Sequence, residues 1–239
     1  TITWKFNDGN GNTSTATQHV VVDDVTAPVK PTIATASGEC SVTVTAPTTT
    51  DNCKGTITGT TSDPTSYSSQ GTYTITWKFD DGNGNTSTAT QHVVVDDVTA
   101  PVAPSIANAT GECSATVTAA PVATDNCVGS VTGTTTDALT YTTQGVHIIT
   151  WKFNDGNGNT STATQHVVVD DVTAPVKPTI ATATGECSVT VTAPTTTDVC
   201  VGTVTGTTSD PTTYNNQGTY TITWKFNDGN GNTSTATQR

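Results

Sequence analysis

Aspartate residues recur at fixed places in this sequence, and many of their neighbours are asparagine and glycine. The segment Asp-Gly-Asn-Gly-Asn occurs four times, the segment Asp-Asp-Val-Thr-Ala-Pro occurs three times, and one further aspartate per copy stands two residues before a cysteine. Carboxylate and amide oxygens suit Ca²⁺, which takes about six to eight oxygen ligands. Because uncompensated carboxylates repel one another at short range, aspartates that the fold brings together predict a calcium site.

We expect one such site at each junction between successive copies of the repeat. The candidate ligands are Asp23, Asp24, Asp51, Asp80 and Asp81 at the first junction, Asp96, Asp97, Asp125 and Asp155 at the second, and Asp170, Asp171, Asp198 and Asp228 at the third, with possible help from Asn83, Asn157 and Asn230. Asn154 and Asn227 stand in later copies at the position of Asp80, so a neutral oxygen is tolerated there. Val199 stands at the position of Asn52, so we do not expect that asparagine side chain to be a ligand. The alternative is that these segments are only turns and solvated linkers.

Cysteines follow the same spacing, with two in each copy. The pairs are Cys40 and Cys53, Cys113 and Cys127, and Cys187 and Cys200. In a small, Thr-rich domain with a thin core, this count predicts one disulfide within each copy, closing a loop of about a dozen residues and contributing about 3 kcal/mol. A bridge between repeats is the alternative. Disulfides imply an oxidising, extracellular compartment, and the lack of further Cys or clustered His argues against zinc.

These residues belong to a tandem repeat. The segment beginning Trp-Lys-Phe starts at positions 4, 77, 151 and 224, with steps of 77 − 4 = 73, 151 − 77 = 74 and 224 − 151 = 73. A constant period of this length predicts an array of similar domains. We expect residues 1–24 to be the last third of a truncated copy, 25–97 and 98–171 to be complete copies, and 172–239 to be a copy without its last residues, so that the chain is a window on a longer array.

Apolar and polar side chains alternate with a period of two along the segments between the acidic loops. We therefore expect strands to position these loops. In residues 71–80 every second side chain is large and apolar, Trp77 among them, and threonine or lysine alternates with them; this pattern predicts a half-buried antiparallel strand. Gly-Asn-Gly-Asn should turn it into a hairpin with 86–95. Shorter strands are expected near 32–36, 40–46 and 56–61. The prediction is an all-β chain of immunoglobulin-like sandwiches of about 73 residues, arranged as an elongated rod.

Composition excludes several classes of function. The formal net charge is −12, with only 8 Lys and Arg residues, and such a surface does not suit nucleic acid, whose phosphates demand positive charge. The sequence has no apolar run long enough for a membrane span. No nucleophile pairs with histidine at a recurring spacing, so we do not expect an enzyme.

The motifs together resemble the hyalin-repeat (HYR) family of immunoglobulin-like domains, as found in large secreted bacterial proteins. The resemblance rests on the segments at 24–28, 38–44, 51–53, 70–76 and 81–85 and covers the whole chain. A second cysteine pair that many members carry is absent here. The resemblance implies an extracellular β-sandwich that serves as a stalk or adhesive module.

We therefore expect a structural region, a stalk or fibre, of a long bacterial surface protein that supports adhesion and is stiffened by Ca²⁺. Its partners would be neighbouring repeats and, in a fibre, identical chains. One alternative is a self-assembling extracellular filament, in which a neighbouring chain could complete the truncated first copy by strand addition. Another is a multivalent module that binds glycan or protein, for which Tyr67, Tyr141 and Tyr214 are the candidate contacts, although tyrosines at the edge of the core explain them more simply.

Overall fold

Every regular element of this protein is a β-strand, as a computed structural model of residues 1–239 shows. The chain forms two compact units, Thr1–Val98 and Thr99–Arg239, which are described separately. The strands of the first unit are β1 (Ile2–Asn7), β2 (Thr13–Gln18), β3 (Ala36–Gly38), β4 (Val42–Thr43), β5 (Thr48–Asp51), β6 (Gly55–Thr58), β7 (Ser66–Tyr67), β8 (Gly71–Asp80) and β9 (Thr86–Val95). No helix in the structure has the length and apolar character needed to cross a membrane.

The second unit contains two further repeats. The strands of the first of them are β10 (Ala109–Gly111), β11 (Ala115–Thr116), β12 (Val122–Asp125), β13 (Gly129–Thr132), β14 (Thr140–Tyr141), β15 (Gly145–Asn154) and β16 (Thr160–Val169). Those of the second are β17 (Val189–Thr190), β18 (Thr195–Asp198), β19 (Gly202–Thr205), β20 (Thr213–Tyr214), β21 (Ile222–Asn227) and β22 (Thr233–Gln238). The all-β, immunoglobulin-like sandwich predicted from the patterning is confirmed.

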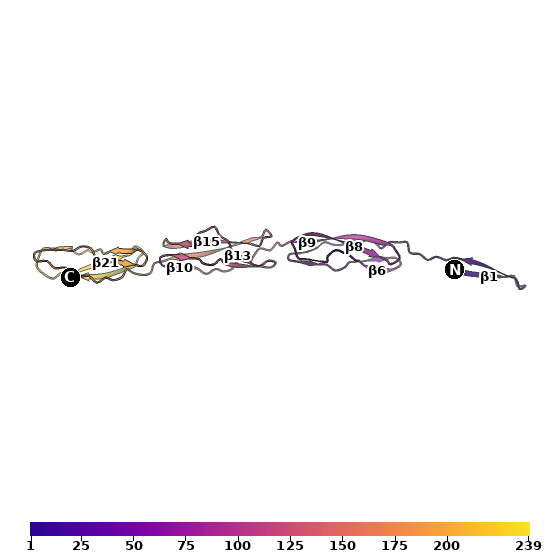
Figure 1. The fold of residues 1–239 in the computed structure, drawn as a ribbon, viewed down its shortest axis with the longest axis horizontal. Helices are drawn as coiled ribbons and strands as arrows, with labels where there is room; N and C mark the ends of the chain where they lie inside the picture. Colours follow the sequence, from indigo (N-terminus) through magenta and orange to yellow (C-terminus); the bar gives the residue numbers. More distant parts are fainter. The chain divides into compact units, whose positions relative to one another are not determined.

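Strands β8 and β9 form the longest hairpin of their repeat (Figure 1). Its two strands pair antiparallel from Gly71 opposite Val95 to Asp80 opposite Thr86, with the bounds that the sequence predicts. Trp77 is 2% exposed, because the apolar face of β8 packs into the core. The turn between the strands needs glycine, since Gly82 has a φ of 83°, in the left-handed region that disfavours other residues.

Two layers enclose that core. On one side, β3 joins β9 in parallel to give the order β3-β9-β8. On the other, β4 pairs with β7. The β5–β6 hairpin is linked to β8 of the first sheet through the bridge between Thr60 and Lys78. Val42 and Ile57 from these strands are buried in one cluster with Trp77. A sandwich of this kind needs the alternating apolar face that each strand supplies.

The prediction of one continuous strand at 40–46 is wrong. Only Val42–Thr43 is a strand there, and the strand expected at 32–36 begins instead at Ala36. The reason is that β3 pairs with β9 whereas β4 pairs with β7, so the chain changes layers between them. The turn is tight: a Cβ on Gly38 would lie 2.7 Å from the Ser41 carbonyl oxygen, which requires glycine at that place.

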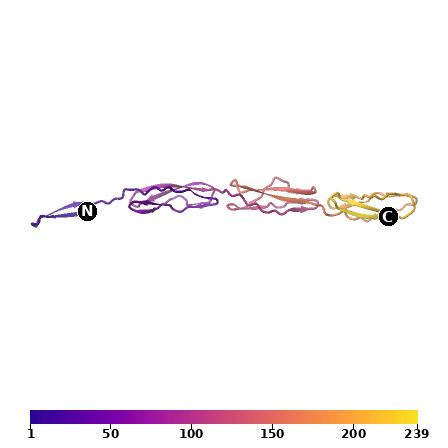
Figure 2. The same ribbon diagram turned by 180° about the vertical axis from the view of Figure 1, so that it is seen from behind.

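In the second unit the same architecture occurs twice. The sheet β10-β16-β15 repeats the order of the first unit, and Trp151 and Trp224 are buried in two separate clusters. Figure 2 shows the last repeat in yellow, with the C-terminus within it. There β21 and β22 are shorter than their counterparts, with six residues each.

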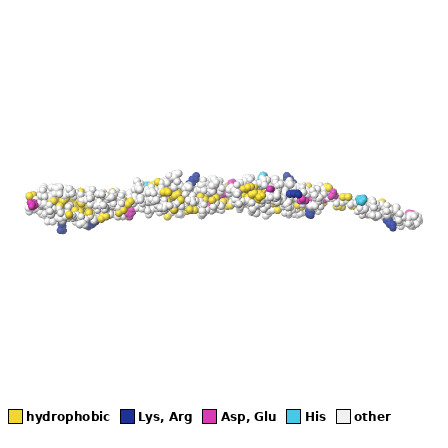
Figure 3. Space-filling model, in the orientation of Figure 1, with side chains coloured by type: hydrophobic (Ala, Val, Ile, Leu, Met, Phe, Trp, Pro, Cys, Tyr) yellow, Lys and Arg dark blue, Asp and Glu magenta, His cyan; other side chains and the backbone are white.

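The surface of the repeats is mostly neutral. In Figure 3 most of the visible atoms are backbone or side chains that are neither apolar nor charged, with apolar atoms and isolated acidic and basic groups between them. Threonines on the outer faces account for this, as in Thr72, Thr74 and Thr76 of β8, which are all exposed. The buried acidic groups are aspartates at the ends of strands and in the loops that follow strands.

Candidate metal centre

Three aspartates from separate loops converge in the second unit. Asp171 follows β16, Asp198 ends β18, and Asp228 opens the turn between β21 and β22. One carboxylate oxygen from each lies within 4.8 Å of the others. The residues are 3%, 6% and 6% exposed, in that order. Groups separated by 27 and 30 residues in the sequence (198 − 171 and 228 − 198) thus form one buried acidic cluster.

Asp198 is held by the turn that follows it. Its Oδ1 accepts hydrogen bonds from the backbone N–H groups of Cys200 at 2.8 Å and Val201 at 3.0 Å. Its Oδ2 is buried and has no hydrogen-bond partner. A buried polar atom without a partner costs about 1–3 kcal/mol, and a cation bound to this oxygen would remove that cost.

Asp228 has the same arrangement. Its Oδ1 accepts hydrogen bonds from the backbone N–H groups of Asn230, Gly231 and Asn232 at 2.7–3.1 Å, whereas its buried Oδ2 has no partner. Burial raises the pKa of Asp228, but these hydrogen bonds outweigh burial and hold the pKa below the ordinary value of 3.8. The carboxylate is therefore negatively charged at neutral pH.

Both backbone polar groups of Asp171 form hydrogen bonds with side chains. Its backbone N–H donates to Gln144 Oε1 at 2.9 Å, and its carbonyl oxygen accepts from Asn232 Nδ2 at 2.7 Å. Its Oδ2 accepts from Asn230 Nδ2 at 3.0 Å. The turn asparagines thus tie Asp171 to the turn that begins at Asp228, and Asn230 serves here as a donor to a carboxylate, whereas the sequence marked it as a possible metal ligand.

The charges of this cluster are not balanced by any side chain. None of the three aspartates forms an ion pair, and two unit charges about 4 Å apart repel by about 4 kcal/mol at an effective dielectric constant of 20. A cation would remove the repulsion and satisfy the two partnerless oxygens. Carboxylates without nitrogen or sulfur ligands suit a hard ion such as Ca²⁺, so the residues present fit the metal that the sequence predicts.

The first unit contains the equivalent cluster. Asp24, Asp51 and Asp81 also have oxygens within 4.8 Å of one another, and Asp51 Oδ2 is buried without a partner. Asn85 donates to both the Asp24 carbonyl oxygen and Asp81 Oδ2, at 2.9 Å and 2.7 Å. The cluster lies beside Cys53, where desolvation and then the Asp24 carboxylate raise the pKa of the thiol.

Other predicted ligands lie outside these clusters. Asp23, Asp96 and Asp170 are exposed, and Asp80 pairs with Lys78 at 3.0 Å. Each Asp-Asp pair therefore contributes its second member to the buried position, because successive side chains of extended backbone point in opposite directions.

The residues predicted for the second junction belong to both units. In the second unit, Asp125 and Asp155 bring carboxylate oxygens within 4.8 Å of one another, and Asp125 Oδ2 is buried without a partner. In the first unit, Asp97 is 3% exposed. Their joint role in a metal site stays a prediction.

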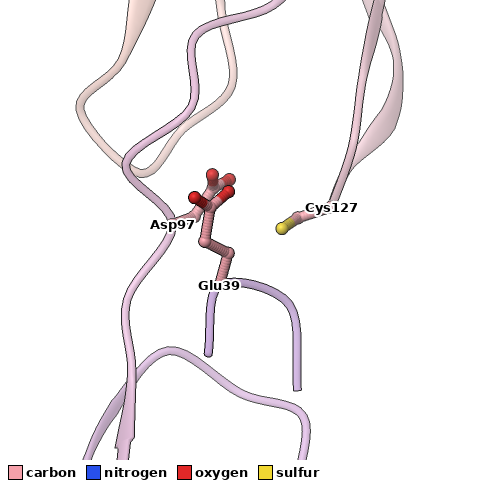
Figure 4. A group of neighbouring side chains, drawn as sticks. All are labelled: Glu39, Asp97 and Cys127. Atoms are coloured by element: carbon pink, nitrogen blue, oxygen red, sulfur yellow. The ribbon is translucent and has the colours of Figure 1, made fainter. Parts of the chain in front are cut away.

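A glutamate lies beside the buried aspartate at the end of a repeat. Figure 4 shows the carboxylates of Glu39 and Asp97 next to each other, and oxygens of the two lie within 4.8 Å. In the second unit Glu112 stands in the same relation to Asp171, and accepts a hydrogen bond from Thr173 Oγ1 at 2.6 Å. These glutamates are not among the predicted ligands, although Gly-Glu-Cys recurs at 38–40, 111–113 and 185–187 and was a usable signal.

The disulfide in the second unit joins two repeats. Cys113 is bonded to Cys200, 87 residues away, with a Cα–Cα distance of 4.9 Å. The predicted pairings within a copy are wrong, since Cys53 and Cys187 are free thiols and Cys113 does not bond to Cys127. Cys40 and Cys127 are also in the disulfide-bonded state.

Strand length explains why a copy cannot close its own pair. Cys113 follows β10, which pairs with Val167–Val169 at one end of the β15–β16 hairpin. Cys127 follows Asp125, which is next to Asp155 at the turn of that hairpin. The hairpin strands have ten residues, or about 30 Å, whereas disulfide-bonded cysteines have Cα atoms about 4.4–6.8 Å apart.

The recurring tyrosines are part of the fold. Tyr67 stacks on Tyr73 with ring centroids 4.3 Å apart and packs against the core of its repeat. Tyr214 and Tyr220 repeat this pair, and Tyr141 stacks on His147. The three tyrosines that the sequence offered as ligand contacts are half-buried, which agrees with the simpler alternative of core-edge residues.

Comparisons with known proteins give a likeness to tandem ectodomains. No family model and no curated protein matches the chain. Among solved structures, it is similar to PcdhgB3 EC1-4 (11% identity, TM-score 0.34, covering 99% of this chain and 81% of that one). It is also similar to the protocadherin gamma B2 extracellular cadherin domains 1-5 (10%, 0.32, 99% and 64%) and to the protocadherin GammaB4 extracellular domain (18%, 0.28, 70% and 37%). At these TM-scores the likeness does not bear on what the chain binds.

Proposed function

We propose that this chain is a spacer of tandem immunoglobulin-like repeats whose junctions are stiffened by Ca²⁺. The observation that carries the proposal is the cluster of Asp171, Asp198 and Asp228, which is buried and contains two partnerless carboxylate oxygens. A protein without a cation here would leave three like charges close together. Bound Ca²⁺ would join the end of one repeat to two loops of the next, so that the angle between them is fixed.

The disulfide supports the same role. Cys113 and Cys200 connect repeats that the acidic cluster also connects, so the junction would be held by a covalent bond and an ion together. A linker held in this way transmits force, whereas a free linker lets domains move independently. Structural disulfides also persist in oxidising compartments, which supports an extracellular location.

The proposal for the whole protein rests on the resemblance of the motifs to hyalin repeats. We place the repeats in a stalk or fibre of a long bacterial surface protein, where they would hold an adhesive part away from the cell. The half-buried, stacked tyrosines weigh against a repeated aromatic surface for glycan or protein. The array would contact its own neighbouring repeats first, and a structural role requires no catalytic group.

Small-angle X-ray scattering of the chain in millimolar Ca²⁺ and in chelator tests whether Ca²⁺ stiffens the junctions between repeats. We expect a larger maximum dimension and a narrower distribution of interatomic distances in Ca²⁺, because fixed junctions keep the repeats apart. The variant Asp198→Asn removes one charge from the cluster and should weaken the response, whereas Asp170→Asn, at an exposed neighbouring position, should leave it unchanged. Identical profiles with and without Ca²⁺ for the unmodified chain would contradict the proposal.

A further inference from the structure

The disulfide between Cys113 and Cys200 lies beside the acidic cluster that contains Asp171. The Sγ atom of Cys200, a carboxylate oxygen of Asp171 and a carboxylate oxygen of Glu112 all lie within 4.8 Å of one another. Because Cys200 is bonded to Cys113, its sulfur is not a thiolate and does not offer the metal ligand that a free cysteine would. The bond is therefore a covalent neighbour of the cluster and not a part of its ligand set.

One half of the bond is on the turn that holds Asp198. The backbone N–H of Cys200 donates to Asp198 Oδ1 at 2.8 Å, and Asp198 pairs with Gly202 at the end of the β18–β19 hairpin. The other oxygen of the same carboxylate, Oδ2, is the buried atom without a hydrogen-bond partner. A movement of Cys200 therefore moves a carboxylate on which the proposed metal centre depends.

The other half of the bond follows Glu112, which is tied to Asp171. The hydroxyl of Thr173 donates to Glu112 Oε2 at 2.6 Å, and the backbone N–H of Thr173 donates to Asp171 Oδ1 at 3.1 Å. Gln144 joins the same two residues, since its Nε2 donates to the Glu112 carbonyl oxygen at 2.8 Å and its Oε1 accepts from the Asp171 N–H at 2.9 Å. Cys113 therefore belongs to the side of the cluster that contains Asp171.

The disulfide thus joins two parts of the cluster that come from different repeats. The side chains of two turn asparagines tie Asp171 to the turn of Asp228. The Cys113–Cys200 bond ties the side of Asp171 to the turn of Asp198. The three carboxylates are thereby held together before any ion is bound, although like charges repel. Such preorganisation strengthens binding, because the ion does not have to bring its ligands together.

We propose that the Cys113–Cys200 disulfide sets the Ca²⁺ affinity of the acidic cluster, so that cleavage of the bond by a thiol weakens Ca²⁺ binding at this junction. This regulation rests on the Ca²⁺ site proposed above. Once the bond is cleaved, the turn of Asp198 is free to move away from Asp171, and repulsion between the carboxylates favours that movement. The junction then loses its covalent tie and its ion together.

Two molecules of a thiol such as reduced glutathione cleave the bond. The first thiolate attacks one cysteine sulfur, which breaks the S–S bond, forms a mixed disulfide and releases the other cysteine as a thiolate. The second thiolate attacks the glutathione sulfur of the mixed disulfide, forms glutathione disulfide and releases the first cysteine. Two glutathione thiols are oxidised to one disulfide, the protein disulfide is reduced to two thiols, and the glutathione protons pass to the cysteine sulfurs.

The coupling between the bond and the ion is reciprocal. If loss of the bond weakens Ca²⁺ binding by a given factor, bound Ca²⁺ disfavours reduction of the bond by the same factor. Ca²⁺ therefore protects this disulfide from thiols. A bond and an ion that merely occupy the same junction would not affect each other in this way.

Isothermal titration calorimetry at one isolated junction tests the proposal. A background chain with Asp51→Asn and Asp125→Asn lacks one carboxylate of each other candidate site and retains every residue of this cluster. Adding Cys113→Ser and Cys200→Ser should raise the Kd for Ca²⁺ by about 10–100-fold, as loss of groups that orient metal ligands does; circular dichroism checks the fold. Cys187→Ser, the same substitution at a cysteine that forms no disulfide, should leave the Kd unchanged.

Two results would contradict different parts of this account. An unchanged Kd in the variant without the disulfide would overturn the regulation and leave the Ca²⁺ site in place. Absence of Ca²⁺ binding by the background chain, in which the disulfide is intact, would contradict the Ca²⁺ site itself and the regulation with it.

The unmodified chain provides a second test that needs no cysteine substitution. The chain is equilibrated in a glutathione redox buffer with millimolar Ca²⁺ or with chelator, and alkylation followed by peptide mass spectrometry measures the reduced fraction of Cys113 and Cys200. We expect Ca²⁺ to lower the equilibrium constant for reduction by the factor found for the Kd. Asp198→Asn should abolish the difference, whereas Asp170→Asn, at an exposed position, should retain it. A reduced fraction that does not depend on Ca²⁺ would overturn the proposal.

Discussion

The hairpin β1–β2 and the hairpin β8–β9 have nearly the same sequence but different surroundings. Both place the tryptophan opposite alanine, and in both the indole Nε1 donates to a glutamine Oε1 at 3.0 Å, Trp4 to Gln18 and Trp77 to Gln91. Trp4 is nevertheless 51% exposed, whereas Trp77 is 2% exposed. The hairpin and its tryptophan–glutamine bond are therefore local, and only burial depends on the rest of the repeat.

The acidic turn likewise has the same local hydrogen bonds in both hairpins but is buried in only one of them. Asp8 accepts hydrogen bonds from the N–H groups of Asn10 and Asn12 at 2.8 Å and 3.1 Å, and Asp81 accepts the equivalent pair at 2.7 Å and 3.1 Å. Asp8 is exposed, whereas Asp81 shares its site with Asp24 and Asp51. The turn forms without the cluster, so the turn alone is not the metal site; the cluster depends on three converging loops.

The largest expected difference between the two hairpins is in the tryptophans. Trp77→Ala should lower the free energy of unfolding of its repeat by about 3–5 kcal/mol, because it leaves a cavity in the core. Trp4→Ala should change stability by less than about 0.5 kcal/mol, as exposed substitutions do. Urea unfolding of both variants, followed by far-UV circular dichroism, measures the two effects. Equal shifts in the two variants would mean that the first hairpin is packed in solution.

A smaller effect should be common to both hairpins. The Asn12 side chain, followed by the Asn10 backbone N–H, lowers the pKa of Asp8. Burial raises the pKa of Asp81, but hydrogen bonds from Asn85 and its neighbours outweigh burial, so this pKa is lowered too. Since both folded-state values lie below the ordinary 3.8, the stabilisation from each carboxylate is present above that pH and is lost as pH falls through the folded pKa.

Carboxyl NMR titration in chelator measures these pKa values. Asn12→Ala should raise the pKa of Asp8 towards its ordinary value, since the lost side chain is the largest cause of the shift. The shift of Asp81 should be unaffected by that change and should respond to Asn85→Ala instead. A pKa of Asp8 at or above 3.8 in the unmodified chain would show that its turn is not formed in solution.

Prediction from sequence succeeded where the information was local or set by strand direction. The alternation in 71–80 gave the bounds of β8, and alternating strands correctly placed Asp24, Asp51 and Asp81 at one end of the repeat. The disulfide was assigned wrongly because a count of two cysteines per copy carries no information on distance. The ten-residue strands β15 and β16 keep Cys113 and Cys127 at opposite ends of their repeat, and this distance decides the pairing.

Glu112 was missed for a related reason. It stands in a turn of irregular backbone, where the period of two gives no direction for the side chain, so only the repetition of Gly-Glu-Cys marked it. The strand predicted at 40–46 failed at the same turn in the first repeat, where the chain crosses from β3 to β4. Local alternation could not show which strand each half would pair with.

We expect Ca²⁺ to bind where aspartates of three loops converge and not at the turns alone, and a thermal melt in Ca²⁺ and in chelator separates the two. At a free Ca²⁺ concentration of about one hundred times Kd, we expect a gain of about 2.7 kcal/mol in the free energy of unfolding. Asp198→Asn should reduce the rise in melting temperature, and Asp8→Asn, in the isolated turn, should leave it unchanged. Superimposable melts of the unmodified chain in Ca²⁺ and chelator would contradict the account.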